Sequence, residues 1–252
     1  MIKGLYAAVS AMVTGVFRQQ AVAHDIANID TPGFKQILTS LSDFDTTSVY
    51  TQSRQKSSEP QTYLGELGLG VMSSPETIDF RQGSLKNTGS QLDFAIDGTG
   101  FFRIRTAAGE RYTRDGRFIR DASGQLTTVD GNLVLSATGQ PIKLPEGEAS
   151  VSTDGSISVN GTASGKIGLA VFTDLKNQLT RDGENTFSSS SNPATTGGGS
   201  ILQSTLEQSN VDASQLMTQM IEISRMYQAA QQMVQNQDEL LGKSIASLGR
   251  IG

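Results

Sequence analysis

The chain lacks several residues on which common protein chemistries depend. It has no cysteine, no tryptophan and a single histidine, His24, among its 252 residues. The absence of cysteine excludes disulfides, thiolate metal sites and thiol catalysis. The sequence also has no apolar run of about 18 residues, the length that a membrane-spanning helix requires. We therefore predict no transmembrane segment.

Basic residues are outnumbered and unclustered. The 20 Lys and Arg residues face 25 Asp and Glu residues, which gives a net charge of −5. Phosphate binding needs clustered Lys and Arg, so nucleic acid is not an expected partner. No nucleophile motif accompanies His24, and the acidic residues lack the spacing of calcium ligands. The sequence predicts no enzyme, no cofactor and no metal site.

A coiled-coil pattern of apolar residues is present at each end of the chain. Successive positions alternate between steps of three and four, the spacing of helices that pack along a shared seam. The two stripes are Ile2, Leu5, Val9, Met12, Val16, Gln19, Ala23 and Ile26, and Leu216, Met220, Ile223, Tyr227, Ala230, Val234, Gln237, Leu241, Ser244 and Leu248. We expect the two terminal helices to pair with each other.

The faces outside these stripes carry few charges. Residues 1–29 hold three charged side chains and residues 211–248 hold six. A solvated coiled coil presents Glu and Lys on its outer face, so helices this poor in charge are expected to be covered on several sides. One interpretation is a monomeric hairpin with a neutral surface. The other is lateral packing against copies of the same helices in a polymer, where Gly4, Ala8 and Gly15 would allow close approach.

The helix boundaries are marked by turn and capping residues. Pro32 disfavours helical geometry at Thr31, so the first helix is expected to end near Ile29 or Asp30. Pro32-Gly33 suits the centre of a type II turn. The last helix is expected to begin near Val211, with Ser209 or Asn210 as its cap.

Most of the remaining chain has the pattern of short strands between turns. From Ile78 to Gln208, apolar and polar residues alternate between dipeptides such as Asp-Gly and Asn-Gly, which accept the positive φ of hairpin turns. The eight turn dipeptides begin at Asp97, Ala108, Asp115, Ser123, Asp130, Asp154, Asn160 and Asp182. This pattern predicts a β sandwich or barrel-like domain. Residues 45–62 are polar and expected to be extended, and residues 188–200 form a low-complexity loop.

These patterns predict a mixed fold with α-helical coiled-coil termini that pair, and a mainly-β body of short strands. The predicted parts are residues 1–30 with 209–252 as terminal helices, residues 31–77 as an extended or β connecting segment, and residues 78–208 as the β-rich domain.

Two alternatives remain open at this point. Lys3, the apolar run from Leu5 to Phe17 and the sequence Ala21-Val22-Ala23 have some features of a signal peptide, which would suit a secreted, adhesin-like binding module. However, Arg18 interrupts the apolar run. The apolar stripe also continues to Ile26, beyond the cleavage site that Ala21-Val22-Ala23 would form. The second alternative is a periplasmic or extracellular β-domain hydrolase, because paired carboxylates meet in space rather than in sequence.

Four segments resemble the axial proteins of the bacterial flagellum, the rod and hook family. Residues 23–35 are similar to the motif A-N-N-[LI]-A-N, two variable residues, T-P-G-[FY]-[KR], although His24 and Asp25 replace the paired asparagines. Residues 93–102 resemble D-[VF]-A-I-x-G-x-G-F-F, and residues 112–118 resemble Y-T-R-[DN]-G-x-F. The fourth segment is 207–212 together with residues 220–227 of the last helix.

The resemblance covers nearly the whole chain in the expected order, and the start, residues 1–12, is also similar to rod proteins. The chain length favours the rod over the larger hook protein. Residues 64–71 resemble the stretch that precedes the β domain in distal rod proteins, but the proximal and distal types are not separated by sequence alone.

The resemblance implies a structural subunit of the basal-body rod, which polymerises helically into the drive shaft that transmits motor torque to the hook. The terminal helices would form an inner coiled-coil domain and the β body would lie further out. The implied partners are copies of the chain, other rod and hook proteins, the flagellar type III export apparatus, and ring proteins where an outer membrane is present. The implied location is the basal body in the cell envelope, reached without a cleaved signal peptide.

The residues assigned to assembly follow the stripes and the first motif. Thr31, Pro32, Gly33 and Phe34 would set the exit from the first helix. Leu216, Met220, Ile223 and Tyr227 would form the intramolecular seam with Leu5, Val9, Met12 and Val16. The remaining assigned residues are Ile26, Asn28, Val234 and Leu241.

Overall fold

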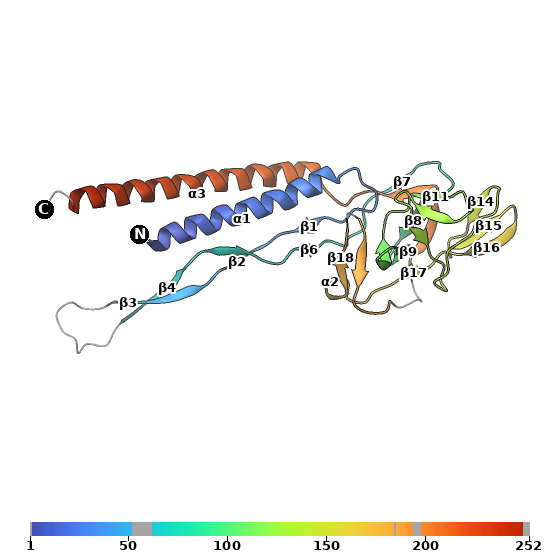
Figure 1. Ribbon diagram of the computed structural model, residues 1–252, viewed down its shortest axis with the longest axis horizontal. Coiled ribbons are helices and arrows are strands. Elements are labelled where there is room, and N and C mark those ends of the chain that lie inside the picture. The colour runs from blue at the N-terminus through green and yellow to red at the C-terminus, as the bar shows by residue number, and fades with distance from the viewer. Residues whose placement is uncertain (1, 52–61, 184, 194–197, 249–252) are drawn as a thin grey trace. The chain divides into compact units, whose positions relative to one another are not determined.

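The computed structural model describes residues 2–51, 62–183, 185–193 and 198–248. It has a long helix at each end, α1 (Ile2–Ala27) and α3 (Ala213–Leu248), with short β-strands between them (Figure 1). The predicted mixed fold, with terminal helices and a mainly-β body, is confirmed. α1 ends slightly before the expected Ile29, and α3 begins slightly after the expected Val211.

The chain forms two compact units. The first contains α1 up to Ile26, the segment 37–77 and α3, and the second contains residues 27–36 and 78–212. The short segment that follows α1 therefore belongs with the β body rather than with the helices.

In the first unit, residues 37–51 and 62–77 form a two-stranded ribbon (Figure 1). β2 (Leu41–Asp43) pairs antiparallel with β5 (Val71–Ser73), and β3 (Thr46–Thr51) pairs antiparallel with β4 (Thr62–Gly68). The short strands β1 (Ile37–Leu38) and β6 (Thr77–Ile78) pair at its base. β3 takes up the start of the polar segment 45–62, whereas residues 52–61 of that segment lie outside the described residues.

Hydroxyl groups on α1 hydrogen-bond the ribbon. The backbone N–H of Val71 donates to Ser10 Oγ at 3.2 Å, and Thr14 Oγ1 donates to the carbonyl of Val71 at 3.4 Å. Thr14 also donates to the Ser10 carbonyl within the helix at 2.7 Å. The polar residues that interrupt the apolar pattern of this helix therefore have a structural use.

The second unit is built on an eight-stranded antiparallel sheet. Its strand order is β11 (Phe118–Arg120), β12 (Leu126–Thr128), β13 (Leu133–Val134), β9 (Phe101–Thr106), β10 (Gly109–Thr113), β19 (Phe187–Ser189) and β18 (Leu179–Arg181), with β17 (Leu169–Ala170) also paired to β9. A single turn of helix, α2 (Leu175–Gln178), precedes β18.

Three smaller sheets complete the second unit. β14 (Ala149–Val151), β15 (Ser156–Val159) and β16 (Thr162–Lys166) form an antiparallel meander. β20 (Ser200–Gln203) pairs with β8 (Phe94–Asp97), and β21 (Thr205–Glu207) pairs with β7 (Leu85–Asn87). The last strands of the body thus pair with its first strands. The loop residues 194–197 lie outside the described residues.

The side chains of β9 divide the body core into two clusters. Phe102 and Ile104 pack into a larger cluster, whereas Phe101 packs into a second one with Tyr112 and Phe187. This division follows the two-residue period of a strand, whose successive side chains point to opposite faces.

The predicted turns have the expected backbone geometry, with one instructive exception. Seven of the eight turn glycines have positive φ, and the exception is Gly116. A Cβ at Gly116 would lie 1.6 Å from the carbonyl oxygen of Phe94. The backbone of Phe94 therefore lies too close to Gly116 for any residue with a side chain at that position. Glycine is required there by close approach of two backbones rather than by dihedral angle.

Within the described residues, no helix combines the length and apolar character needed to cross a membrane.

Candidate functional site

The apolar stripe predicted on α3 is the buried face of that helix. Leu216, Ile223 and Ala230 are buried, and the positions between and beyond them are half-buried: Met220, Tyr227, Val234 and Leu241. The buried residues of α3 therefore recur along one face of the helix.

The buried face of α1 differs from the predicted stripe. Val9 and Val16 expose 43% and 41% of their surface, whereas Ala8, Thr14 and Gly15 are buried. The other predicted positions, Leu5, Met12 and Ile26, are half-buried.

Small residues of α1 lie next to α3. A Cβ at Gly15 would lie 3.8 Å from Cδ2 of Tyr227, and a Cβ at Gly4 would lie 3.5 Å from Nε2 of Gln237. These two contacts run in opposite directions along the helices, which are therefore antiparallel. The predicted intramolecular seam through Val9 and Val16 is corrected accordingly, since glycines allow the helices to approach on the adjacent face.

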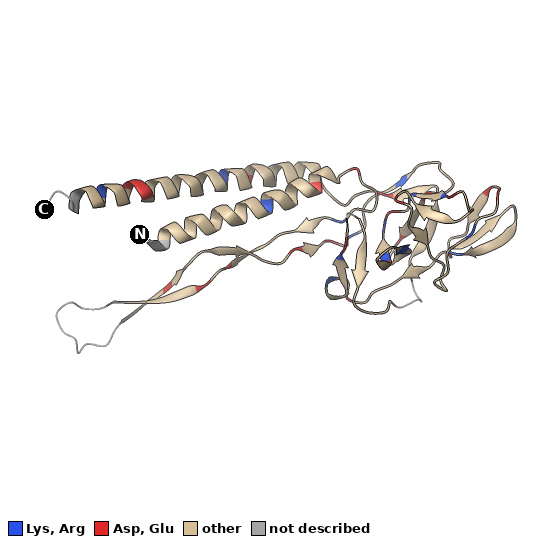
Figure 2. Cartoon of the chain, in the orientation of Figure 1, with Lys and Arg blue, Asp and Glu red and all other residues tan. Residues whose placement is uncertain are grey.

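Both helices leave large apolar side chains exposed. On α1 these are Tyr6, Val9, Val13, Val16 and Phe17, and on α3 they are Met217, Ile221, Met226, Met233, Leu240 and Ile245. Charged side chains are sparse along both helices (Figure 2). The positions on α1 again follow steps of three and four, so this helix carries a second apolar stripe, which we call the outer stripe (Tyr6, Val9, Val13 and Val16).

The segment after α1 forms the predicted turn. The N–H of Phe34 donates to the Thr31 carbonyl at 3.3 Å, and Gly33 has a φ of +70°. Asn28 supports the turn, since its Oδ1 accepts a hydrogen bond from Thr31 Oγ1 at 3.2 Å. Positive φ at the third position of a turn is the type II requirement that glycine satisfies.

The body holds this turn on both sides. Phe34 is buried, and the guanidinium of Arg181 lies 4.9 Å from the centre of its ring. The Asn185 side-chain amide donates to the Pro32 carbonyl at 2.8 Å. Thr31, Pro32, Gly33 and Phe34 therefore form a turn at the exit from α1 that is held by residues of the body.

Next to this turn lies a buried charge cluster that we call the junction triad: Lys35, Arg114 and Glu207. Lys35 Nζ lies 2.5 Å from Oε1 of Glu207, and Arg114 Nη1 lies 2.9 Å from Oε2. The fraction of side-chain surface exposed to solvent is 1% for Lys35, 6% for Arg114 and 0% for Glu207. Each residue belongs to a different one of the motifs quoted from the sequence.

The junction triad was not singled out from the sequence. The available signal was that a charged residue stood in each motif, but nothing in a sequence says that residues so far apart meet.

Asn210 has a different role from the one predicted. Ser209 or Asn210 was expected to cap α3, but α3 begins only at Ala213, and Asn210 Oδ1 accepts the N–H of Gln36 at 2.8 Å while its Nδ2 donates to the carbonyls of Asp79 and Arg81. The Asn210 side chain thus joins the two connecting segments to the segment 79–81.

Burial alters the proton affinity of several groups in the body. Burial lowers the pKa of Lys35 and of Arg114, and the charge of Glu207 opposes this in both cases. The pKa of Tyr112 is raised to about 12, mainly by burial and secondarily by the neighbouring Glu110.

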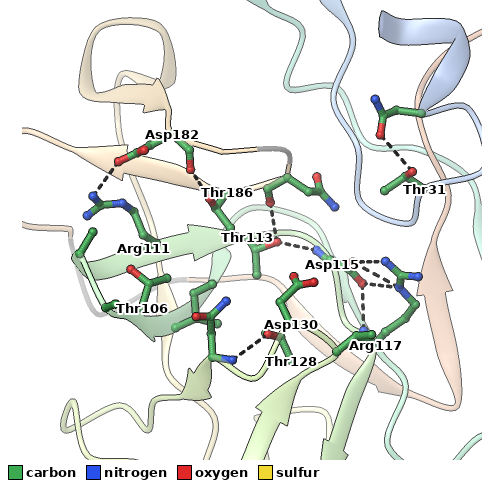
Figure 3. A pocket seen from close by; sticks show the side chains of 17 residues that line it. Thr31, Thr106, Arg111, Thr113, Asp115, Arg117, Thr128, Asp130, Asp182 and Thr186 are labelled. Atoms are coloured by element: carbon green, nitrogen blue, oxygen red, sulfur yellow. Dashed lines mark hydrogen bonds and ion pairs between the residues drawn. The ribbon is translucent and has the colours of Figure 1, made fainter.

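The body also has a polar pocket of about 600 Å³ beside the β9–β10 hairpin (Figure 3). Its charged side chains are largely paired with one another. Arg111 lies 2.6 Å from Asp182, and Arg117 lies 2.7 Å from Asp115. Among the residues that the structure describes, no group of three His, Asp or Glu side chains is placed to hold a metal ion. The pocket has the character of a self-paired polar surface rather than of a reaction centre.

Comparison with known proteins places the same segments in flagellar families. Residues 95–160 match the flagellar hook protein FlgE/F/G D1 domain, and residues 202–248 match the flagellar basal body rod FlgEFG protein C-terminal region. The chain is 33% identical to the flagellar basal-body rod protein FlgF of Caulobacter vibrioides, over the whole length of both. The chain belongs to the flagellar rod and hook protein family.

Other members of this family are similar over comparable lengths. The flagellar basal-body rod protein FlgG of Bacillus subtilis is 33% identical over 96% of this chain and 97% of its own length. The flagellar hook-basal body complex protein FlhO of the same organism is 30% identical over the whole of both chains. The chain is accordingly a structural protein of the flagellar basal body, not an enzyme, and it assembles with other flagellar axial proteins.

Proposed function

We propose that this rod-family chain is a subunit that polymerises helically into a drive shaft and transmits motor torque to the hook. In this proposal residues 1–30 and 209–252 form an inner coiled-coil domain, and residues 78–208 form the outer domain. Residues 31–77 form the extended or β segment that connects the two domains. The observation that carries it is the outer stripe of α1, which leaves apolar side chains exposed on a helix almost without charge.

The physical reason is that two helices need only one apolar stripe each to pack against one another, so a second stripe on α1 is free for another contact. The Gly4–Gly15 face of α1 lies next to α3, whereas the side chains of the outer stripe expose between 41% and 67% of their surface. Extended apolar surfaces of this kind mark protein–protein contacts. A contact between unlike faces of identical subunits generates a helical filament when the rotation between subunits does not close into a ring.

The proposal extends to how the chain reaches its place. It would be exported unfolded by the flagellar type III apparatus without a cleaved signal peptide. In the basal body it would adjoin other rod and hook proteins, and ring proteins where an outer membrane is present.

The direct test is negative-stain electron microscopy of basal bodies purified from a strain that lacks this chain. We expect basal bodies without a complete rod, arrested before the hook. The point of arrest would separate a proximal from a distal position. Complete, motile flagella in that strain would overturn the proposal.

A matched pair of variants tests the outer stripe itself. Val13→Asp places a charge on an exposed stripe position, and Val129→Asp makes the same change at a comparably exposed site on the body; the two valines expose 50% and 56%. We expect Val13→Asp to abolish motility and Val129→Asp to retain it, with unchanged unfolding of both purified proteins. Normal motility of Val13→Asp would argue against packing through this stripe.

A further inference from the structure

The junction triad is an unusual way to stabilise a protein interior. It places two cations and one anion where water is excluded, which leaves a net positive charge in the core of the body. Removing charges from water is costly, and a buried ion pair is often no better for stability than apolar residues of similar volume. The cluster therefore requires an explanation other than stability.

The contacts of Glu207 indicate what that explanation is. Its carboxylate accepts hydrogen bonds from Lys35 Nζ, from the N–H of Gly83 at 3.0 Å and from Arg114 Nη1. Its backbone carbonyl accepts the N–H of Gly33 at 2.7 Å. One residue thus joins the segment that leaves α1, the segment 81–83, the segment that leads to α3, and the body.

The two cations extend these contacts. Lys35 Nζ also donates to the Arg81 carbonyl at 2.7 Å. Arg114 Nη2 donates to the Gly98 carbonyl at 2.7 Å, and its Nη1 lies 3.3 Å from the Ile96 carbonyl. Each of these bonds has a fixed direction, whereas apolar side chains would allow the segments to slide past one another.

We propose that Glu207 is a positioning residue that fixes the register in which the two connecting segments, 31–36 and 205–210, lie on the body. The junction triad contributes uniqueness of arrangement rather than net stability. Its importance for assembly rests on the proposed rod function, since a polymer requires every subunit to direct its terminal helices from the same point.

The decisive variant replaces the whole triad by apolar residues: Lys35→Met, Arg114→Met and Glu207→Leu in one full-length chain. We expect its thermal unfolding midpoint to equal or exceed that of the wild type. Amide hydrogen exchange should nevertheless be faster at Gly33, Gln36 and Gln208, whose N–H groups bond across the junction. The N–H of Arg103, in the central strand, should remain protected.

Wild-type protection at Gly33, Gln36 and Gln208 in the triple variant would overturn the proposal, and so would a stable variant with normal motility. A stable variant that fails to build the rod would support it. If motility were unaffected by deleting the whole chain, the proposed function would fail, but the exchange measurement would still decide the role of the triad.

A single variant covers the case in which the triple variant does not fold. Lys35→Met leaves Arg114 and Glu207 as a neutral pair and removes the contacts of Lys35 Nζ with Glu207 and with the Arg81 carbonyl. We expect faster exchange at Gly33 and Gln36 and unchanged exchange at Arg103. The matched control is Lys166→Met, which removes a surface ion pair with Asp154 at 3.3 Å and should leave all four amides unchanged. Equal exchange in the two variants would contradict the proposal.

Discussion

Gly33 lies directly against the backbone of Arg114: a Cβ at Gly33 would be 2.3 Å from the carbonyl carbon of that residue. The same glycine has a φ of +70°, which side-chain-bearing residues rarely adopt. The turn after α1 therefore depends on glycine for two reasons, one internal to the turn and one imposed by the body.

Gly33→Ala and Gly131→Ala separate these two reasons. Both positions have positive φ, but a Cβ at Gly131 meets no atom within 4 Å. We expect Gly131→Ala to cost about 1–2 kcal/mol of unfolding free energy, from backbone strain alone. Gly33→Ala should cost clearly more, because Arg114 must move. Urea unfolding of the purified chains measures both, and equal losses would show that the contact with Arg114 is unimportant.

Ile104→Ala should destabilise the body strongly, because Ile104 is fully buried in the larger core cluster. Truncation of a buried isoleucine typically costs about 2–5 kcal/mol. Ile119→Ala is the matched control, since Ile119 is nearly half exposed on an outer strand and its truncation should change stability by less than about 0.5 kcal/mol. Similar losses in denaturant unfolding would mean that the assigned core is wrong.

Tyr112 should make the body sensitive to alkaline pH. Its pKa is about 12 in the folded chain against a usual value of 10.0, so the unfolded chain loses this proton first as the pH rises. The contribution to stability is therefore complete below pH 10 and is lost progressively as the pH approaches 12.

Tyr112→Phe keeps the ring, which packs edge-on against Phe172 at a centroid distance of 5.0 Å, and removes the titrating group. Unfolding free energy measured across this pH range should fall less steeply for the variant than for the wild type. If the unfolding free energies of the two proteins fell in parallel with pH, Tyr112 would not be the source of the alkaline sensitivity.

The isolated subunit should lose its terminal helices to protease before its body. Helices gain most of their stability from packing, and the outer stripe of α1 is uncovered in a single chain. We expect limited proteolysis of dilute protein to remove both termini and leave a fragment that contains residues 78–193. The same protease should spare the termini in assembled rods. Resistance of both termini in the dilute subunit would contradict this expectation.

Local chemistry explains which features could be predicted from the sequence. Pro32-Gly33 and the Asp-Gly turns depend on residues adjacent in the chain, and each of their glycines except Gly116 has the expected positive φ. On α3, the buried residues Leu216, Ile223 and Ala230 all lie on the stripe that the spacing predicted.

The rest depended on information that a sequence does not contain. On α1, hydrophobicity favoured Val9 and Val16, whereas the structure places Gly4 and Gly15 beside α3, since close approach depends on small size rather than on apolar character. Lys35 and Glu207 are 172 positions apart, so no local pattern could pair them. Asn210 has the residue type of a helix cap. Only the folded chain shows that its side chain hydrogen-bonds backbone groups outside α3.

The pairing of the last body strands with the first has a kinetic consequence. β21 pairs with β7 and β20 with β8, so the body cannot close until residues 200–207 have joined residues 85–97. Forming contacts between residues so distant along the chain costs loop-closure entropy before the contacts stabilise the fold. Such contacts therefore slow folding. A chain delivered from its N-terminus could therefore complete its body only after residues 200–207 had arrived.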